Sequence, residues 1–196
     1  MSHYFSKKQD SPLRLREVSL EFENQIFSFL TGSGTFSPKK IDSGTMILIK
    51  YMIVKPEWRV LDLGCGYGPV GIVAAKLFPS ARVVMSDVNE RAIGLAVKNV
   101  KRNSIKNAEV IESDLFENIK EKFNTVLCNP PQTAGKKVCF SIIEQSKDYL
   151  LKDGLLQIVA RHNKGGKALS GRMEDVFGNV SVLGKKAGYR VYCSKA

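Results

Sequence analysis

The sequence predicts an α/β protein whose mostly parallel sheet is covered by helices on both faces. Two observations lead to this prediction. From residue 58 onward, strand-length segments alternate with helix-length segments, an order typical of parallel sheets with helical crossovers. The expected strands are also continuously apolar, which indicates burial on both faces of the sheet. With 196 residues, the chain is most simply one domain with a sizeable core.

Residues 1–55 are expected to form an N-terminal extension that packs on the main domain of residues 56–196. In residues 16–31, apolar side chains lie on either side of a polar Glu-Asn-Gln, and this pattern predicts a hairpin. A glycine-rich loop follows. Residues 42–54 then begin with helix-capping residue types and continue as an apolar run of helix length. The extension is therefore predicted to be a hairpin followed by a helix.

The main domain is predicted to alternate regularly between strands and helices. We expect strands at 58–63, 82–87, 108–113, 123–129 and 155–161, and helices at 69–78, 89–104, 136–151 and 167–177. Two further short strands, 180–184 and 188–194, are separated only by Lys-Lys-Ala. Because so short a connection joins antiparallel strands, we expect this pair at one edge of the sheet.

The net charge of +11, from 30 basic and 19 acidic residues, favours a polyanionic partner such as RNA. The excess is concentrated in residues 135–196, which hold 12 basic and 5 acidic residues. A charge added only for solubility would be spread more evenly along the chain, although exposed lysines are also common on ordinary surfaces. The C-terminal third is therefore the expected RNA-facing part.

Composition also predicts a soluble cytoplasmic protein without a metal site. The first ten residues lack the apolar core of a signal peptide, and no apolar run reaches the roughly 18 residues of a membrane span. The four cysteines are scattered without a CxxC pair, which favours reduced thiols over disulfides or zinc. The chain has only two histidines. The sequence does not indicate that the protein binds a membrane or a metal, and it does not indicate an oligomeric state.

The first candidate site is the glycine-rich turn of residues 61–68. Gly64, Gly66 and Gly68, together with Cys65, lie between a strand and a helix, where bare backbone can approach a ligand. The spacing is GxGxG and not the GxGxxG of the dinucleotide fingerprint. Asp62 would repel a pyrophosphate but attract an ammonium group. The turn therefore favours S-adenosylmethionine, with its amino-acid end, over NAD.

Two further carboxylates close the next two strands. Asp87 can accept the hydroxyl groups of a ribose, and Asp114 can accept the exocyclic amine of adenine. Each has a purely structural alternative: Asp87 as the cap of the following helix, and Asp114 as the cap of a turn. Because successive strands of a parallel sheet end at the same edge, we expect both at one cofactor site, with their neighbours Val88 and Leu115.

The fourth strand ends in Asn129, Pro130 and Pro131. Two prolines stop the ladder and make the preceding carbonyl groups rigid. In their order along residues 58–131, VLDLGCGYG, SDVN, SDL and NPP resemble the motifs of class I S-adenosylmethionine-dependent methyltransferases. GTFSPKKIDSGTMIL, NPPQTAGK, FGNV and GYRVYCS resemble, more narrowly, the methyltransferase small domain family, which includes a guanine-N2 enzyme of ribosomal RNA.

This resemblance implies a Rossmann-like class I methyltransferase fold with a seven-stranded sheet and an antiparallel edge strand. It implies methyl transfer to an exocyclic base amine of RNA, with guanine N2 of ribosomal RNA as the expected target. Asn129 and Pro130 would hold the amine through oxygen acceptors that Pro131 helps to immobilise, and Asn129 would also border the cofactor. No strong general base is required, because positive charge develops on nitrogen before a proton leaves.

The substrate side departs from related amine methyltransferases in one position. Many have Tyr or Phe after the prolines, which stacks on the target ring, whereas this chain has Gln132. Phe36 and Phe140 are candidate substitutes. Substrate contacts are further expected from Lys136, Lys137, His162, Lys164 and Lys167.

Other functions remain compatible with these residues. The alternatives are a glutamine-N5 methyltransferase acting on protein, a small-molecule methyltransferase, and a non-catalytic RNA-binding protein that retains the fold. The net charge favours RNA over a protein substrate.

Overall fold

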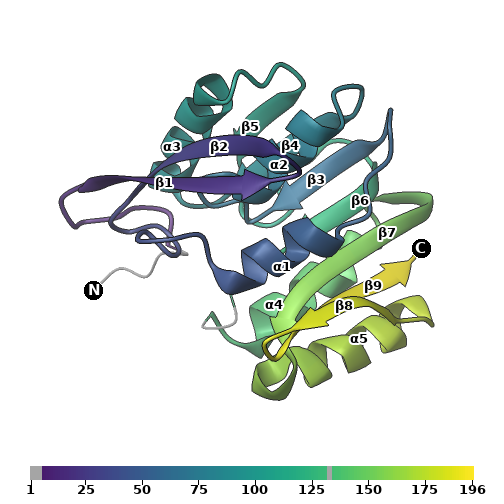
Figure 1. The fold of residues 1–196 in the computed structure, drawn as a ribbon. Helices are drawn as coiled ribbons and strands as arrows, with labels where there is room; N and C mark the ends of the chain where they lie inside the picture. The colour runs from purple at the N-terminus through teal and green to yellow at the C-terminus, as the bar shows by residue number, and fades with distance from the viewer. Residues whose placement is uncertain (1–5, 132–133) are drawn as a thin grey trace.

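The computed structural model describes residues 6–131 and 134–196. Its centre is a seven-stranded sheet in the order β5-β4-β3-β6-β7-β9-β8 (Figure 1). The strands are β3 (Arg59–Leu63), β4 (Arg82–Asp87), β5 (Ala108–Glu112), β6 (Phe123–Cys128), β7 (Leu150–Arg161), β8 (Ser181–Lys186) and β9 (Tyr189–Lys195). The first five are parallel, whereas β9 is antiparallel to both β7 and β8. The predicted sheet, with its antiparallel edge, is confirmed.

Helices cover both faces of this sheet. They are α1 (Ser43–Tyr51), α2 (Pro69–Leu77), α3 (Glu90–Arg102), α4 (Lys136–Ser146) and α5 (Lys167–Phe177), with a short π-helical turn η2 (His162–Gly166) before α5. Side chains of α1, α2 and α3 share one apolar cluster with Val60 and Val83, whereas α4 and α5 share the other with Leu61 and Val84. Adjacent strand residues thus serve opposite cores, as buried parallel strands require.

The N-terminal hairpin, β1 (Leu15–Phe22) and β2 (Gln25–Gly32), forms a separate two-stranded sheet. Its buried Phe27 and Phe29 join the apolar cluster of α1, α2 and α3. Asn99 of α3 accepts from the Leu30 amide at 2.7 Å and donates to the Leu30 carbonyl at 2.8 Å. A helix side chain thus takes the place of a neighbouring strand along β2.

Two adjoining predicted boundaries are wrong. The helix expected at 136–151 ends at Ser146, and β7 begins at Leu150 and not at 155. The Ser146 hydroxyl donates to the Ile142 carbonyl at 2.6 Å, and the Phe123 amide donates to the Tyr149 carbonyl at 2.9 Å. Because the chain pairs with β6 from Leu150 onward, the last residues of the predicted helix are extended and not helical.

The first helix is also shorter than predicted, because it ends at Tyr51 and not at 54. Gln157 of β7 holds the backbone of Ile53 through two hydrogen bonds of 2.7 and 2.8 Å. This contact keeps the chain after α1 extended over the sheet. None of the helices formed by the described residues is long and apolar enough to cross a bilayer.

Candidate active site

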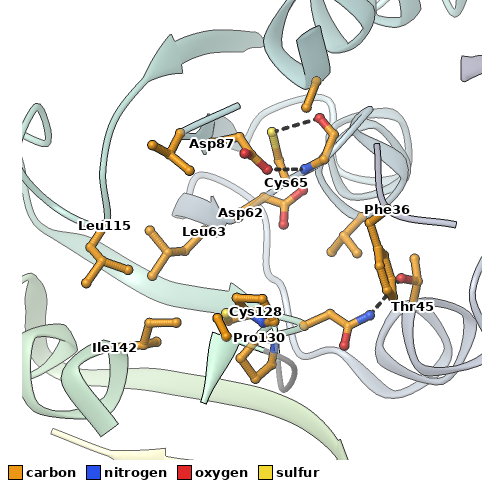
Figure 2. A pocket seen from close by; sticks show the side chains of 18 of the residues that line it. Phe36, Thr45, Asp62, Leu63, Cys65, Asp87, Leu115, Cys128, Pro130 and Ile142 are labelled. Atoms are coloured by element: carbon orange, nitrogen blue, oxygen red, sulfur yellow. Dashed lines mark hydrogen bonds between the residues drawn. The ribbon is translucent and has the colours of Figure 1, made fainter. Parts of the chain in front are cut away.

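A pocket of about 320 Å³ lies at the carboxyl ends of β3, β4 and β6 and is closed on one side by the start of α1 (Figure 2). Its volume is in the range of small-molecule and cofactor sites. Twelve residues predicted from sequence line it: Phe36, Asp62, Gly64, Cys65, Gly66, Asp87, Val88, Asp114, Leu115, Asn129, Pro130 and Pro131. The pocket also has lining residues that sequence reasoning did not select, among them Asp42, Thr45 and Ser113.

The glycine turn after β3 presents backbone to this pocket. The amides of Gly64 and Cys65 both donate to the Ser86 carbonyl at 2.8 Å, which holds the turn against β4. A Cβ added at Gly64 or Gly66 would meet no atom within 4 Å, so these positions border open space. Gly68 differs, because a Cβ there would lie 2.5 Å from Met85 Cε, and Gly68 does not line the pocket. The absence of a side chain at Gly68 allows α2 to begin close to β4.

Asp62 is a buried carboxyl group in the wall of the pocket, with 2% of its surface exposed. One oxygen accepts from the Gly71 amide at 2.8 Å, which ties β3 to α2. Burial raises the pKa of Asp62 to about 7, the Gly71 hydrogen bond opposes this rise, and the nearby charge of Asp87 adds to it. A cation beside this carboxyl would favour its ionised form, so the site fits an ammonium group.

Asp87 is bound by backbone on both oxygens. It accepts from the Gly66 amide and from the Asn89 amide, each at 2.8 Å. Burial raises its pKa, and these amides oppose the rise. Asn89, and not Asp87, caps α3. Because an ionised carboxylate offers about four lone-pair positions, Asp87 retains acceptor capacity toward the pocket.

Asp114 is exposed at the pocket rim. The turn that follows is closed by Ser113, whose hydroxyl accepts from the Asn118 amide at 3.1 Å and donates to the Leu115 carbonyl at 2.9 Å. In the described part of the chain the Asp114 carboxylate makes no hydrogen bond of its own. The turn-capping alternative for Asp114 is therefore wrong, and its carboxylate is available to a ligand.

The side chain of Asn129 is held in one orientation. Its Nδ2 donates to Thr45 Oγ1 at 3.0 Å and to Asp42 Oδ2 at 3.2 Å. Asp42 also caps α1 by accepting from the amides of Gly44 and Thr45 at 2.8 and 3.2 Å. Because an ionised carboxylate can only accept, the NH₂ group of Asn129 must face α1. Among the described residues, no donor bonds to the Oδ1 of Asn129, which therefore remains as an acceptor.

Asp42 and Thr45 were absent from the predicted site. The only sequence signal was the capping character of the segment that begins at residue 42, which gives no reason to connect it with Asn129, 87 positions later. Figure 2 shows the Phe36 ring beside Thr45 at this side of the pocket. Gln132, the position where related enzymes carry an aromatic residue, lies outside the described residues.

Five expected substrate residues do not line the pocket. Lys136 and Lys137 are exposed in the first turn of α4. His162, Lys164 and Lys167 lie in and just after η2. His162 Nδ1 is 2.7 Å from the Tyr192 hydroxyl, and partial burial together with the charges of Arg190 and Lys167 lowers the histidine pKa. These residues can contact a large substrate only outside the pocket.

The sheet order, the glycine turn after β3 and the Asn-Pro-Pro segment after β6 define a class I methyltransferase fold. The model of the methyltransferase small domain family matches residues 26–193, and the chain belongs to this family. The family membership confirms the prediction of an S-adenosylmethionine-dependent methyltransferase.

Proteins of similar sequence support this family membership. The chain is 38% identical over 196 residues to the uncharacterized protein YbxB of Bacillus subtilis, with 98% of both chains covered. It is 31% identical over 194 residues to ribosomal RNA small subunit methyltransferase C of Hamiltonella defensa. That match covers 97% of this chain and 56% of the relative. The chain thus spans little more than half the length of that enzyme.

A solved structure shares the fold over nearly the whole chain. The 16S rRNA N2 G1207 methyltransferase of T. thermophilus, in complex with AdoMet and guanosine, superposes with a TM-score of 0.81 at 23% identity. The similarity covers 96% of this chain and 53% of that one.

Proposed function

We propose that this protein transfers a methyl group from S-adenosylmethionine to the exocyclic N2 amine of a guanine in ribosomal RNA. The observation that carries the proposal is the fixed amide of Asn129, whose oxygen is left as an acceptor in the pocket wall. The relatives named methyltransferase C, and the related enzyme described with AdoMet and guanosine, support the choice of base and RNA.

The residues present fit the cofactor. Backbone without side chains at Gly64 and Gly66 leaves room beside a buried carboxyl group whose pKa is raised by burial. We assign the amino-acid end to this turn and Asp62, the ribose to Asp87, and the adenine to the neighbourhood of Asp114. When bound, S-adenosylmethionine supplies an electrophilic methyl group on a sulfonium.

The protein's task is to hold a weak nucleophile. The lone pair of a guanine amine is delocalised into the ring, and N–H donation to two fixed oxygens favours its localisation on nitrogen. We assign these acceptors to the side chain of Asn129 and the carbonyl of Pro130. The same oxygens stabilise the positive charge that develops on nitrogen, and the proton can leave afterwards to water. The rigid Pro130–Pro131 pair keeps the acceptors in place without reorganisation.

Methyl transfer from radiolabelled S-adenosylmethionine tests the proposal. The substrates are ribosomal RNA, intact small subunits and total protein from cells that lack this gene, followed by mass spectrometry of the nucleosides. We expect label in N2-methylguanosine. Label in glutamine of a protein would overturn the RNA assignment, and cofactor binding without transfer to any of these substrates would favour a non-catalytic RNA-binding protein.

A further inference from the structure

A second hollow lies outside the cofactor pocket, at the carboxyl end of β7. It is therefore at the same end of the parallel strands as the pocket. It has a volume of about 310 Å³ and is formed by the turn after β7 and the turn between β8 and β9. Its charged or titratable lining consists of His162, Lys185, Lys186, Tyr189 and Arg190, with no carboxylate among the lining residues. Every charged side chain that lines the hollow is therefore cationic.

Within the part of the chain that the structure describes, no carboxylate forms an ion pair with the lysines and the arginine of this hollow. Lys185 and Arg190 lie directly opposite each other in the β8–β9 ladder, a like-charge pairing that destabilises a sheet. None of the ion pairs among the described residues includes Lys185, Lys186 or Arg190. An anion placed between the two turns would remove this repulsion.

The walls of the hollow are held together by specific contacts. The His162 amide donates to the Gly188 carbonyl at 2.9 Å, which joins the two turns. The Arg161 guanidinium lies 4.9 Å from the centre of the Tyr189 ring. The Tyr192 hydroxyl occupies Nδ1 of His162, which leaves Nε2 as the ring nitrogen for an outside ligand. The basic groups are thus presented on a built surface.

The hollow and the cofactor pocket lie next to each other at the start of α1. Tyr189 lines the hollow, and its ring lies so close to Gly44 that an added Cβ would be 3.0 Å from Tyr189 Cε1. Gly44 lies between Asp42 and Thr45, which line the pocket and hold Asn129. A polyanion crossing the start of α1 would therefore pass directly from one site to the other.

We propose that this hollow binds backbone phosphates of the RNA strand that delivers the target base to the pocket. The inference rests on the proposed function and adds the position of the RNA backbone. Phosphate contacts position a strand without reading its sequence, and multiple lysine and arginine side chains are the groups that make them. Lys164 lies in η2 and Lys167 begins α5, and both would extend the same track.

The test compares two double variants of equal charge change. Lys185→Ala/Lys186→Ala removes two exposed cations of the hollow. Lys120→Ala/Lys122→Ala removes two exposed lysines just before β6, at the amino end of the parallel strands and so at the opposite end from the hollow. Binding of a short fluorescein-labelled single-stranded RNA of mixed sequence is measured by anisotropy across a salt series. Calorimetry with S-adenosylmethionine checks that each variant keeps its fold.

We expect the hollow variant to reduce the slope of log affinity against log salt by about 1.4, which is about 0.7 for each lost phosphate contact. Its KM for ribosomal RNA should rise in the methyl-transfer assay. The control variant should keep the wild-type slope. Equal losses in both variants, or tighter binding of polyglutamate than of RNA, would overturn the phosphate site. Absence of guanine methylation by the wild type would instead refute the proposed function, whatever the slopes.

Discussion

At the scale of single residues, Asp42 has two tasks at the start of α1. It caps the helix through the amides of Gly44 and Thr45, and it accepts from Nδ2 of Asn129. A cap of this kind is ordinarily a matter of helix stability. Here it also determines which end of the Asn129 amide faces the pocket, so helix capping and the proposed positioning of substrate depend on one carboxylate.

The amide oxygen of Asn129 provides the first prediction. Asn129→Ala should bind S-adenosylmethionine as the wild type does but lose on the order of a hundredfold in kcat, the scale expected for one positioned polar group. Calorimetry and single-turnover methyl transfer measure the two quantities separately. Unchanged kcat would remove Asn129 from the proposed mechanism.

Thr45→Val gives a graded comparison at the same group. This variant keeps the shape of the side chain but removes one of the two acceptors that orient Nδ2 of Asn129. Because Asp42 still holds the amide, we expect a smaller loss of about two- to tenfold, the equivalent of one hydrogen bond. A loss as large as that of Asn129→Ala would point to a direct contact between Thr45 and the ligands.

Asp62 provides a prediction about pH. Its pKa is raised to about 7 in the free protein, and a bound ammonium would favour the ionised form. Protonation of Asp62 at low pH therefore competes with binding of the cofactor. The affinity for S-adenosylmethionine should fall by up to about tenfold for each pH unit below that value. Calorimetry over a pH series measures this. Asp62→Asn, which keeps an oxygen for the Gly71 amide, should bind weakly and without this pH dependence; a flat profile for the wild type would contradict the assignment.

At the scale of elements, Asn99 of α3 and Asn103, the residue that follows this helix, attach the N-terminal hairpin to α3. Asn99 bonds both backbone groups of Leu30 and also donates to the Tyr67 carbonyl at 2.8 Å. Asn103 makes the same paired bonds to Ser28 at 3.1 and 2.9 Å. The hairpin is thus fastened to the helix next to the glycine turn, and its stability is coupled to that side of the pocket.

The two asparagines form a matched pair for a stability measurement. Asn99 is fully buried, so Asn99→Ala leaves three backbone groups without partners and should lower the free energy of unfolding by about 2–3 kcal/mol. Asn103 is half-buried, and water can replace its bonds, so Asn103→Ala should cost about 1 kcal/mol. Urea denaturation compares both. Equal decreases in the free energy of unfolding would show that burial does not make Asn99 more important for stability than Asn103.

At the scale of the whole molecule, charge and fold are arranged around one edge of the sheet. Residues 57–134, which supply the glycine turn and the carboxylates, are nearly balanced with 10 basic and 9 acidic residues. Residues 135–196 supply most of the excess positive charge. The antiparallel return of β9 beside β7 brings the β8–β9 turn next to the start of α1 (Figure 1). The most basic part of the chain thereby borders the cofactor pocket.

Most of the fold could be predicted because its signals are local. Apolar strands, helix periodicity and the glycine turn each depend on residues within a few positions of one another. The segment from 147 to 151 could not be predicted in this way. Its apolar residues suit a helix as well as a strand, and pairing with Phe123 decided for the strand.

The sequence by itself determined that Asp62, Asp87, Asp114 and Asn129 lie at one edge, because consecutive parallel strands carry their carboxyl ends to the same side. Only the tertiary structure decided what holds Asn129, which structural tasks Asn89 and Ser113 take over, and that Lys164 and Lys167 lie outside the pocket. Those facts depend on contacts between segments far apart in the chain, and such contacts are set by how α1 and the edge hairpin pack on the sheet.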